Sequence, residues 1–168
     1  DAANARMRAE DKSVFDLSAL PASIAKAQAN EWIGGLSSRP TRVLYDEHGK
    51  EIPAATLDGL VADANLGALA DNTTPRYALV VERAALRSFP SYLRAFSSND
   101  DTDIDRFQES AVFPGTPLVI LHESRDGKWV FVVSPRYRAW IERKHIAEGP
   151  RDTVLPFAAR TPYRLVTG

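Results

Sequence analysis

The chain of 168 residues contains no cysteine, and this absence excludes several kinds of function. A thiol nucleophile, a disulfide framework and a zinc site built from thiolates are all ruled out within this sequence. Long apolar runs are also missing, because no stretch approaches the ~20 residues that a membrane-spanning helix needs. Nor is there an excess of positive charge, since 21 Lys and Arg accompany 22 Asp and Glu, giving a net charge of -1. Without a dense basic track, nucleic-acid binding is not predicted.

The composition that is present is typical of a soluble globular protein. Apolar residues make up 44% of the chain and charged residues 26%, both ordinary values for a folded domain. The length suits one ordinary domain, or one small domain with an attached arm. The chain starts at Asp1 instead of Met and stops in Thr161–Gly168, which has the pattern of a beginning strand. We therefore expect a piece of a longer protein from which an upstream segment has been removed.

The strongest structural signal lies between Asp105 and Val133. Two apolar runs, Leu118–Leu121 and Trp129–Val133, flank a charged turn at Ser124–Lys128. Runs of β-branched and aromatic residues around an Asp-Gly pair predict a β-hairpin. Other elements are predicted at Tyr77–Val81, Ala84–Arg87 and Arg138–Ile141 as strands, with a single tight turn at His145–Ala147. Short strands at this spacing predict an all-β barrel from about residue 76 to 147.

The N-terminal part of the chain carries helical patterns instead. A polar arm is expected at Asp1–Ser13. Apolar residues three and four apart predict a helix from about Ala22 to Ile33, ended by Gly34-Gly35. After Pro53, a second stripe from Leu57 to Leu66 predicts another helix. Between the two helices a short strand is predicted at Arg42–Tyr45, and an exposed polar loop is predicted later at Ser91–Thr102.

Five short motifs occur in an order that resembles a known family. They are Leu86-Arg87-Ser88-Phe89-Pro90, Asp105-Arg106-Phe107-Gln108-Glu109-Ser110, Pro114-Gly115-x-Pro117, Leu121-His122-x-Ser124-x-Asp126-Gly127-x-Trp129 and Trp140. Together they look like the first bacterial SH3-type (SH3b1) domain of NlpC/P60-family cell-wall peptidases, over roughly Tyr77 to Ala147. The stretch Trp32–Leu69 is similar to the helical clip that precedes this domain in multidomain members. One departure is Ala139, because the family tends to have Gly before the closing Trp, and a methyl group there is expected to narrow a groove.

This resemblance implies a mainly β fold, with a small SH3-like β-barrel preceded by an N-terminal segment of short α-helices. It implies a helical clip or arm at residues 1–75 and the bacterial SH3-like barrel at residues 76–148. An extended exit segment toward a missing next domain is expected at residues 149–168, where Tyr163–Gly168 is similar to the start of a second barrel. In the family, that second barrel leads to a papain-like domain with a Cys-His catalytic pair.

The same resemblance implies a non-catalytic module that binds peptidoglycan stem peptides and positions an NlpC/P60-type murein peptidase. The family cleaves stem peptides, commonly next to γ-D-glutamyl linked to a diamino acid. The implied partners are the stem peptide and a downstream or separate NlpC/P60 catalytic domain, with no cofactor, and the implied location is the cell envelope or periplasm. Because the chain has no cysteine, it is not expected to hydrolyse peptides by that mechanism. The alternative is a structural or protein-interaction SH3-like domain that packs on a catalytic partner.

A polar cluster before the hairpin supplies most of the candidate ligand-binding residues. An arginine such as Arg106 can fork onto a carboxylate, and Gln108 or Glu109 can hold amide and ammonium groups. Stem peptides offer all of these groups. A capped turn with internal ion pairs, which are common and individually weak, explains the cluster equally well. With the loop aromatic Tyr137 added, the candidate set is Asp105, Arg106, Gln108, Glu109 and Tyr137.

His122, Ser124 and Asp126 lie close in sequence, but they do not predict a catalytic triad. Triads are defined by geometry, and a G-x-S-x-G nucleophile elbow is absent from the sequence. We expect a structural histidine beside a turn that the Ser and Asp side chains stabilise. A self-sufficient hydrolase using Ser124 and His122 is the third alternative. The three histidines are too scattered to suggest a metal site, and Trp129 is expected in the core.

Overall fold

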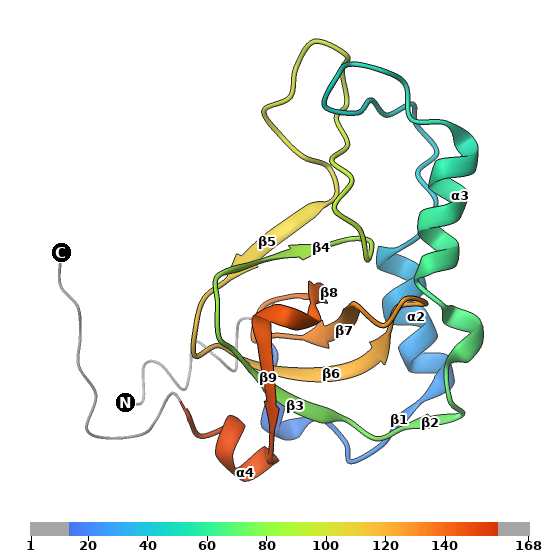
Figure 1. Ribbon diagram of the computed structural model, residues 1–168. Coiled ribbons are helices and arrows are strands. Elements are labelled where there is room, and N and C mark those ends of the chain that lie inside the picture. The colour runs from blue at the N-terminus through green and yellow to red at the C-terminus, as the bar shows by residue number, and fades with distance from the viewer. Residues whose placement is uncertain (1–13, 158–168) are drawn as a thin grey trace, which may run out of the picture.

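A seven-stranded antiparallel sheet dominates the computed structural model, which describes residues 14–157 (Figure 1). Its strands are β3 (Arg76–Val80), β4 (Ala84–Arg87), β5 (Gln108–Val112), β6 (Pro117–Glu123), β7 (Trp129–Val133), β8 (Arg138–Glu142) and β9 (Ile146–Gly149). They follow the order β5-β4-β8-β7-β6-β3-β9. The short 3₁₀ helix η3 (Arg143–His145) joins β8 to β9, beside the predicted tight turn. The predicted mainly β fold is therefore confirmed.

The central hairpin is built by β6 and β7, as the sequence predicts. Val119 pairs with Val133 and Glu123 with Val130, with one irregularity of register between them. The turn residue Gly127 has φ 68°, a backbone region that suits glycine. Asp126 accepts the amide of Lys128 at 3.0 Å, which closes the turn. Local turn chemistry and apolar runs therefore specify this part of the barrel.

The helices precede and follow the sheet. They are η1 (Leu17–Ala19), α2 (Lys26–Leu36), α3 (Ala54–Asp63), η2 (Leu66–Ala68) and α4 (Arg151–Val154), and a small sheet pairs β1 (Ile24–Ala25) with β2 (Asn72–Thr73). Figure 1 shows α3 and the long β4–β5 loop extending together beyond one end of the large sheet. An apolar cluster joins them, to which α3 contributes Leu57 and Leu60 and the loop contributes Phe89, Ala95 and Phe107.

Four expectations for the connecting segments need correction. The first helix starts later than predicted and runs through Gly34-Gly35, because Ile33 is fully buried and this packing outweighs the ~1 kcal/mol cost of a helical glycine. The predicted strand at Arg42–Tyr45 is reduced to two isolated bridges of Tyr45. The predicted exposed loop at Ser91–Thr102 buries Ala95 and Phe96.

The fourth correction concerns the exit segment. Its described part forms the short helix α4, which buries Val154 against β3. Pro150 precedes the helix with an extended backbone and fixes where it begins. The polar arm expected at Asp1–Ser13 and the strand expected at Tyr163–Gly168 lie outside the described residues.

The sheet buries apolar residues on both of its faces. The barrel interior holds Ala78, Val80, Leu86, Leu118, Ile120, Val130, Val132, Ala139 and Ile141, among others. The second face packs against the N-terminal helices, with Ile33, Val119, Phe131 and Trp140 in one cluster. All five residues of β7 are buried because alternate side chains enter the two clusters. Trp129, which the sequence predicts in the core, packs with Phe131 and Val133 under the helices and not in the barrel interior.

A buried serine connects the first helix to the barrel. Ser37, the residue after α2, donates its hydroxyl to the Ser88 carbonyl at 2.7 Å. The same oxygen accepts the indole N–H of Trp140 at 2.9 Å. Trp140 is fully buried, so this contact satisfies a polar group that water does not reach.

Candidate functional site

Asp105 is a structural residue. Its side chain is 8% exposed, and Oδ2 lies 3.0 Å from Nη1 of Arg87, whose side chain is 7% exposed. Its other carboxylate oxygen accepts the backbone amides of Ala95 and Phe107. Both oxygens therefore hold the β4–β5 loop in place, and we do not retain Asp105 as a ligand-binding residue.

The other polar candidates before the hairpin lie at the edge of the sheet. Arg106, Gln108 and Glu109 are all exposed, and β5 is an edge strand paired with β4. The Glu109 carboxylate accepts the hydroxyl of Ser88. These three residues form an accessible polar edge, in which Glu109 already has one internal partner.

Tyr137 lies in the β7–β8 loop with 39% of its surface exposed. Its carbonyl accepts both the amide and the hydroxyl of Ser134. The next residue, Arg138, is not free for a ligand: its guanidinium lies 4.6 Å from the ring centroid of Phe15 and 4.5 Å from that of Trp32. Desolvation by these neighbours lowers the pKa of Arg138 from its ordinary value. The N-terminal segment therefore holds the loop that presents Tyr137.

A second tyrosine, Tyr92, lies at the centre of a cluster of aromatic and charged residues on the surface. Tyr92 is 61% exposed, yet its ring contacts the buried Trp129 edge-to-face at 4.9 Å between centroids. The ammonium of Lys144 lies 5.6 Å from the Tyr92 ring centroid and 3.4 Å from its hydroxyl. Residues from the β4–β5 loop, the start of β7 and η3 thus meet at one place. We call Tyr92, Trp129, Glu142 and Lys144 the Tyr92 site.

Electrostatic contacts fix the polar groups of the Tyr92 site. Lys144 Nζ lies 2.8 Å from Oε2 of Glu142, whose side chain is 12% exposed. Burial opposes the charged form of Glu142, but the nearby Lys144 ammonium and Tyr92 hydroxyl outweigh it and lower the carboxyl pKa. Desolvation, reinforced by Glu142, raises the pKa of the Tyr92 hydroxyl. At neutral pH the site therefore presents a neutral phenol beside an ammonium group.

A histidine lies on the inner side of the Tyr92 site, between two carboxylates. His145 Nε2 is 3.3 Å from Oε2 of Glu142, and its Nδ1 is 3.2 Å from Oε2 of Glu82. Glu142 Oε2 is buried, and none of its approaches within the described residues has hydrogen-bond geometry. It nevertheless lies 2.8 Å from the Lys144 ammonium, so this contact is an ion pair that holds Lys144.

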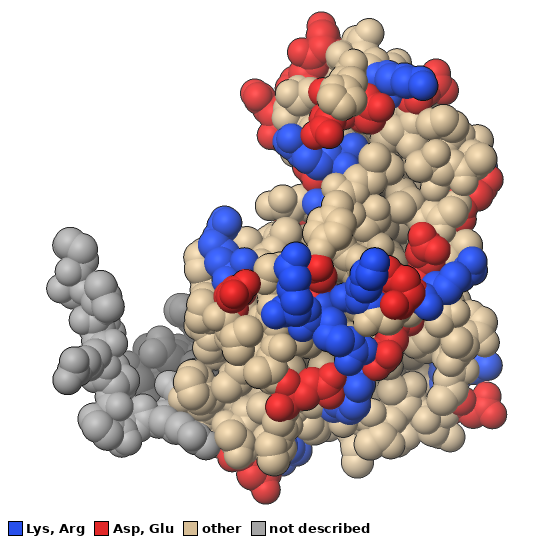
Figure 2. Space-filling view, in the orientation of Figure 1, with Lys and Arg blue, Asp and Glu red and all other residues tan. Residues whose placement is uncertain are grey.

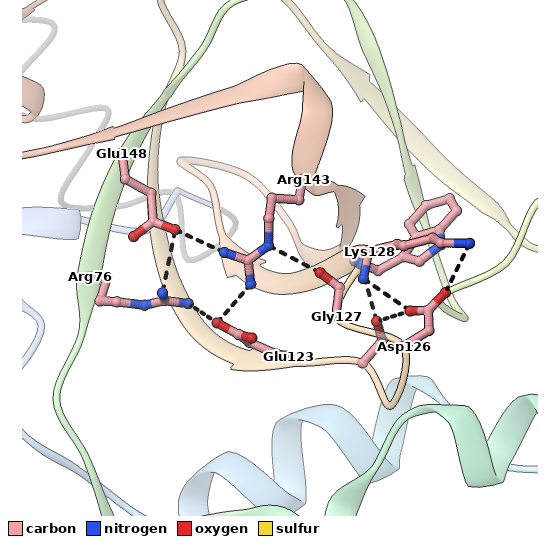
Figure 3. Close-up of polar contacts among 9 residues, drawn as sticks. Arg76, Glu123, Asp126, Gly127, Lys128, Arg143 and Glu148 are labelled. Carbon is pink, nitrogen blue, oxygen red and sulfur yellow. Dashed lines mark hydrogen bonds and ion pairs between the residues drawn. The ribbon is translucent and has the colours of Figure 1, made fainter.

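A network of four charged residues lies on the barrel beside the hairpin turn (Figure 3). Glu123 Oε1 is 2.6 Å from Arg76 and 2.6 Å from Arg143, and Glu148 Oε1 is 3.3 and 3.2 Å from the same two arginines. The hydrogen bond from Arg143 lowers the pKa of Glu123. Figure 2 shows acidic and basic side chains interleaved over this face, so its charges are largely compensated.

The structure does not assemble a triad from His122, Ser124 and Asp126. Ser124 Oγ donates to Asp126 at 2.7 Å and accepts the Trp129 amide at 3.0 Å. His122 Nε2 instead contacts the carbonyl of Asn65 at 3.0 Å. The serine and aspartate therefore close the hairpin turn, and the histidine joins the barrel to the segment after α3.

The sequence analysis missed the Tyr92 site because its members are far apart in the chain. The one local signal was Tyr92 itself, an aromatic residue in a polar loop just after Pro90. Ala139, expected to narrow a groove, is fully buried in the barrel interior. Among the described residues no group of three or more His, Cys, Asp or Glu could hold a metal ion. Helices long and apolar enough to cross a membrane are likewise not found in residues 14–157.

Comparisons with known proteins identify the barrel. A solved NlpC/P60 endopeptidase from Photobacterium damselae subsp. piscicida has the same fold, with a TM-score of 0.63 and 19% sequence identity. The match covers 83% of this chain and 34% of that chain, so the present sequence spans about a third of the endopeptidase's length. A search of curated protein sequences finds no match. Residues 90–142, which include β5 to β8, match the family model of the SH3 domain of SH3b1 type.

Proposed function

We propose that this chain is a non-catalytic module that binds the stem peptide of peptidoglycan and positions an NlpC/P60-type catalytic domain on it. The single observation that carries the proposal is the Tyr92 site, where an exposed ring is held by Trp129 and flanked by the Lys144 ammonium. The chain has no cysteine, so the catalytic thiol of such an enzyme would lie outside this sequence. Stem peptides lie in the cell wall, and we infer that the module acts in the cell envelope or periplasm.

The chemistry of the site matches an extended peptide that carries carboxylates. Domains of SH3 type use exposed aromatic residues to grip extended peptides. Because the Tyr92 ring already rests on Trp129, little side-chain freedom remains to be lost when a ligand stacks on it. Lys144 adds a positive charge whose side chain is 61% exposed. A stem peptide offers both an extended backbone and several carboxylates to such a surface.

A second contact zone is proposed for the edge strand. Arg106, Gln108 and Glu109 are exposed there and can meet carboxylate, amide and ammonium groups of the same ligand. Tyr137 is the aromatic residue proposed for the β7–β8 loop. These four residues extend the predicted recognition surface, and the Tyr92 site adds a rigid anchor to it.

Titration of the 168-residue chain with a synthetic L-alanyl-γ-D-glutamyl-diaminopimelate tripeptide tests the proposal. We expect Tyr92→Ala and Lys144→Ala to weaken binding about tenfold each, the loss expected when one good contact is removed. Lys50→Ala, which removes an exposed lysine in the turn after Tyr45, is the matched control and should leave affinity unchanged. Unchanged affinity in both site variants would exclude the Tyr92 site, and no binding by the unmodified chain would exclude peptide recognition.

A protein-interaction role is the second candidate, and exposed apolar residues favour it. Val81 is 48% exposed and Phe113 is 58% exposed. The Gly115 amide donates a hydrogen bond to the Val80 carbonyl, close in sequence to both residues. Val81 and Phe113 therefore border the same turn. Exposed apolar groups of this kind are typical of interfaces. Here the polar edge at Arg106 would pack on a catalytic domain instead of binding peptide.

Two variants separate the candidates. Under the interaction role, Phe113→Ser and Arg106→Ala abolish association with an NlpC/P60 catalytic domain, measured by analytical ultracentrifugation, and leave tripeptide affinity intact. Under the recognition role, Arg106→Ala lowers tripeptide affinity while the circular dichroism spectrum and the association stay unchanged. The self-sufficient hydrolase alternative would require peptide cleavage by the isolated chain, lost in Ser124→Ala.

A further inference from the structure

A pocket with both polar and apolar walls lies where the segment after α3 crosses the barrel. It has a volume of about 360 Å³, within the size range of small-molecule sites. One wall comes from residues 65–76 and the other from β6. The lining residues include Asn65, Ala68, Ala70, Asn72, Thr73, Thr74, Arg76, His122 and Glu123. None of these residues belongs to the Tyr92 site or to the polar edge of β5.

The walls of this junction pocket are fixed before any ligand binds. Asn65 has φ 56°, and this left-handed conformation aims its carbonyl at His122 Nε2 across 3.0 Å. On the same wall, Thr73 of β2 pairs with Ile24 of β1. Arg76, at the start of β3, pairs with Ile120 of β6. A pocket held by backbone pairing and a histidine contact loses little entropy when it is filled.

The pocket carries little net charge. The Arg76 guanidinium is compensated by Glu123 at 2.6 Å and by Glu148 at 3.3 Å. Burial lowers the pKa of His122, so its imidazole is neutral at pH 7. The hydrogen bond from Nε2 to the Asn65 carbonyl then uses the single ring proton. A strongly charged ligand would find no uncompensated partner among these groups.

The remaining lining groups are amides, hydroxyls, two alanines and the buried Ile120 and Leu121 of β6. Asn72 and Thr74 are exposed and offer both donors and acceptors, and Thr73 lies between them. Ala68 and Ala70 provide apolar surface of methyl size. We propose that this pocket binds an uncharged N-acetylated hexose, with its hydroxyls on the Asn and Thr groups and its acetyl methyl against the alanines. This inference rests on the proposed function, because peptidoglycan presents such sugars beside its stem peptides.

Titration of the isotope-labelled 168-residue chain with N,N'-diacetylchitobiose tests the inference. We expect amide shifts at Thr73, Thr74 and His122, and at least about a tenfold loss of affinity in Ala70→Trp, which fills the pocket. Ala55→Trp places the same side chain at an exposed position of α3 and should bind normally. Because a tryptophan can disturb folding, Thr74→Ala is the second variant, with a smaller loss expected from one missing hydroxyl.

The stem tripeptide and the Tyr92→Ala variant distinguish this inference from the proposed function. Disaccharide binding that is lost in Ala70→Trp and kept in Tyr92→Ala supports the pocket. Tripeptide binding without disaccharide binding overturns the pocket and leaves the proposed function standing. Disaccharide binding that is unaffected by both Ala70→Trp and Thr74→Ala also overturns it. Failure of both ligands to bind overturns both proposals.

Discussion

Among the polar residues in and next to the β4–β5 loop, some are buried and others are exposed. The residue types alone do not show which are which. Asp105 is buried with Arg87, whereas its neighbours Arg106 and Gln108 are exposed. Within the described residues the buried Nε of Arg87 has no hydrogen-bond partner, so its charge depends on Asp105. A buried charge of this kind is costly once its partner is removed.

We expect Asp105→Asn to lower the free energy of unfolding by about 3 kcal/mol, since it leaves the Arg87 charge unpaired in the interior. Urea denaturation followed by tryptophan fluorescence measures the change. Asp103→Asn, at an exposed position of the same loop, should change stability by no more than about 0.5 kcal/mol. If Asp105→Asn lowers the free energy of unfolding by less than about 1 kcal/mol, the prediction is wrong. The Arg87–Asp105 pair would then contribute no more than an ordinary surface ion pair.

At the same scale, Ser37 serves two buried groups with one hydroxyl. It donates to Ser88 and accepts from Trp140. We expect Ser37→Ala to cost about 1–3 kcal/mol, because the indole N–H is left unsatisfied in the core. Equilibrium unfolding compared with Ser38→Ala, an exposed neighbour, provides the measurement. Equal stability of the two variants would mean that the buried hydrogen bonds contribute nothing net.

At the scale of elements, glycines have opposite roles in helices and turns. Gly59 lies within α3, and a Cβ added there would meet no other atom within 4 Å. Gly127 has φ 68° in the hairpin turn, where L side chains are strained. We therefore expect Gly59→Ala to stabilise the protein by about 0.5–1 kcal/mol and Gly127→Ala to destabilise it by about 1 kcal/mol. Melting temperatures that move in the same direction for both variants would contradict this expectation.

At the scale of the whole molecule, His122 couples the stability of the barrel to its contact with the N-terminal part. Desolvation lowers the pKa of His122 below its ordinary value of 6.5. Between these two pKa values the unfolded chain therefore binds a proton that the folded protein does not bind. The contribution of His122 to the free energy of unfolding is fully present above pH 6.5. It is lost as the pH falls through the lower pKa that His122 has in the folded protein. The lowered carboxyl pKa values of Glu123 and Glu142 act in the same direction, but only below about pH 4.5.

We therefore expect the free energy of unfolding to fall between pH 7.5 and pH 5.5. In His122→Gln, which cannot titrate in this range, the dependence should be weaker. His48→Gln makes the same substitution at an exposed position and is the control. The measurement is urea unfolding at both pH values. Identical pH dependence in wild type and His122→Gln would show that the imidazole is not responsible.

The sequence by itself determined the mainly β fold and the hairpin. Apolar runs, the Asp-Gly turn and the ordered motifs are local signals, and the barrel and the SH3b1-type match follow from them. The sequence also determined that no thiol chemistry is possible in this chain.

Only the tertiary structure decided which polar groups face solvent and which groups meet. The Tyr92 site joins residues 92, 129, 142 and 144, and the junction pocket joins residues 65–76 to β6. Because Ile33 is buried, α2 continues through two glycines at which local helix propensity predicts its end. In each case the stabilising contacts join residues that are distant in the chain. A local sequence pattern does not predict such contacts.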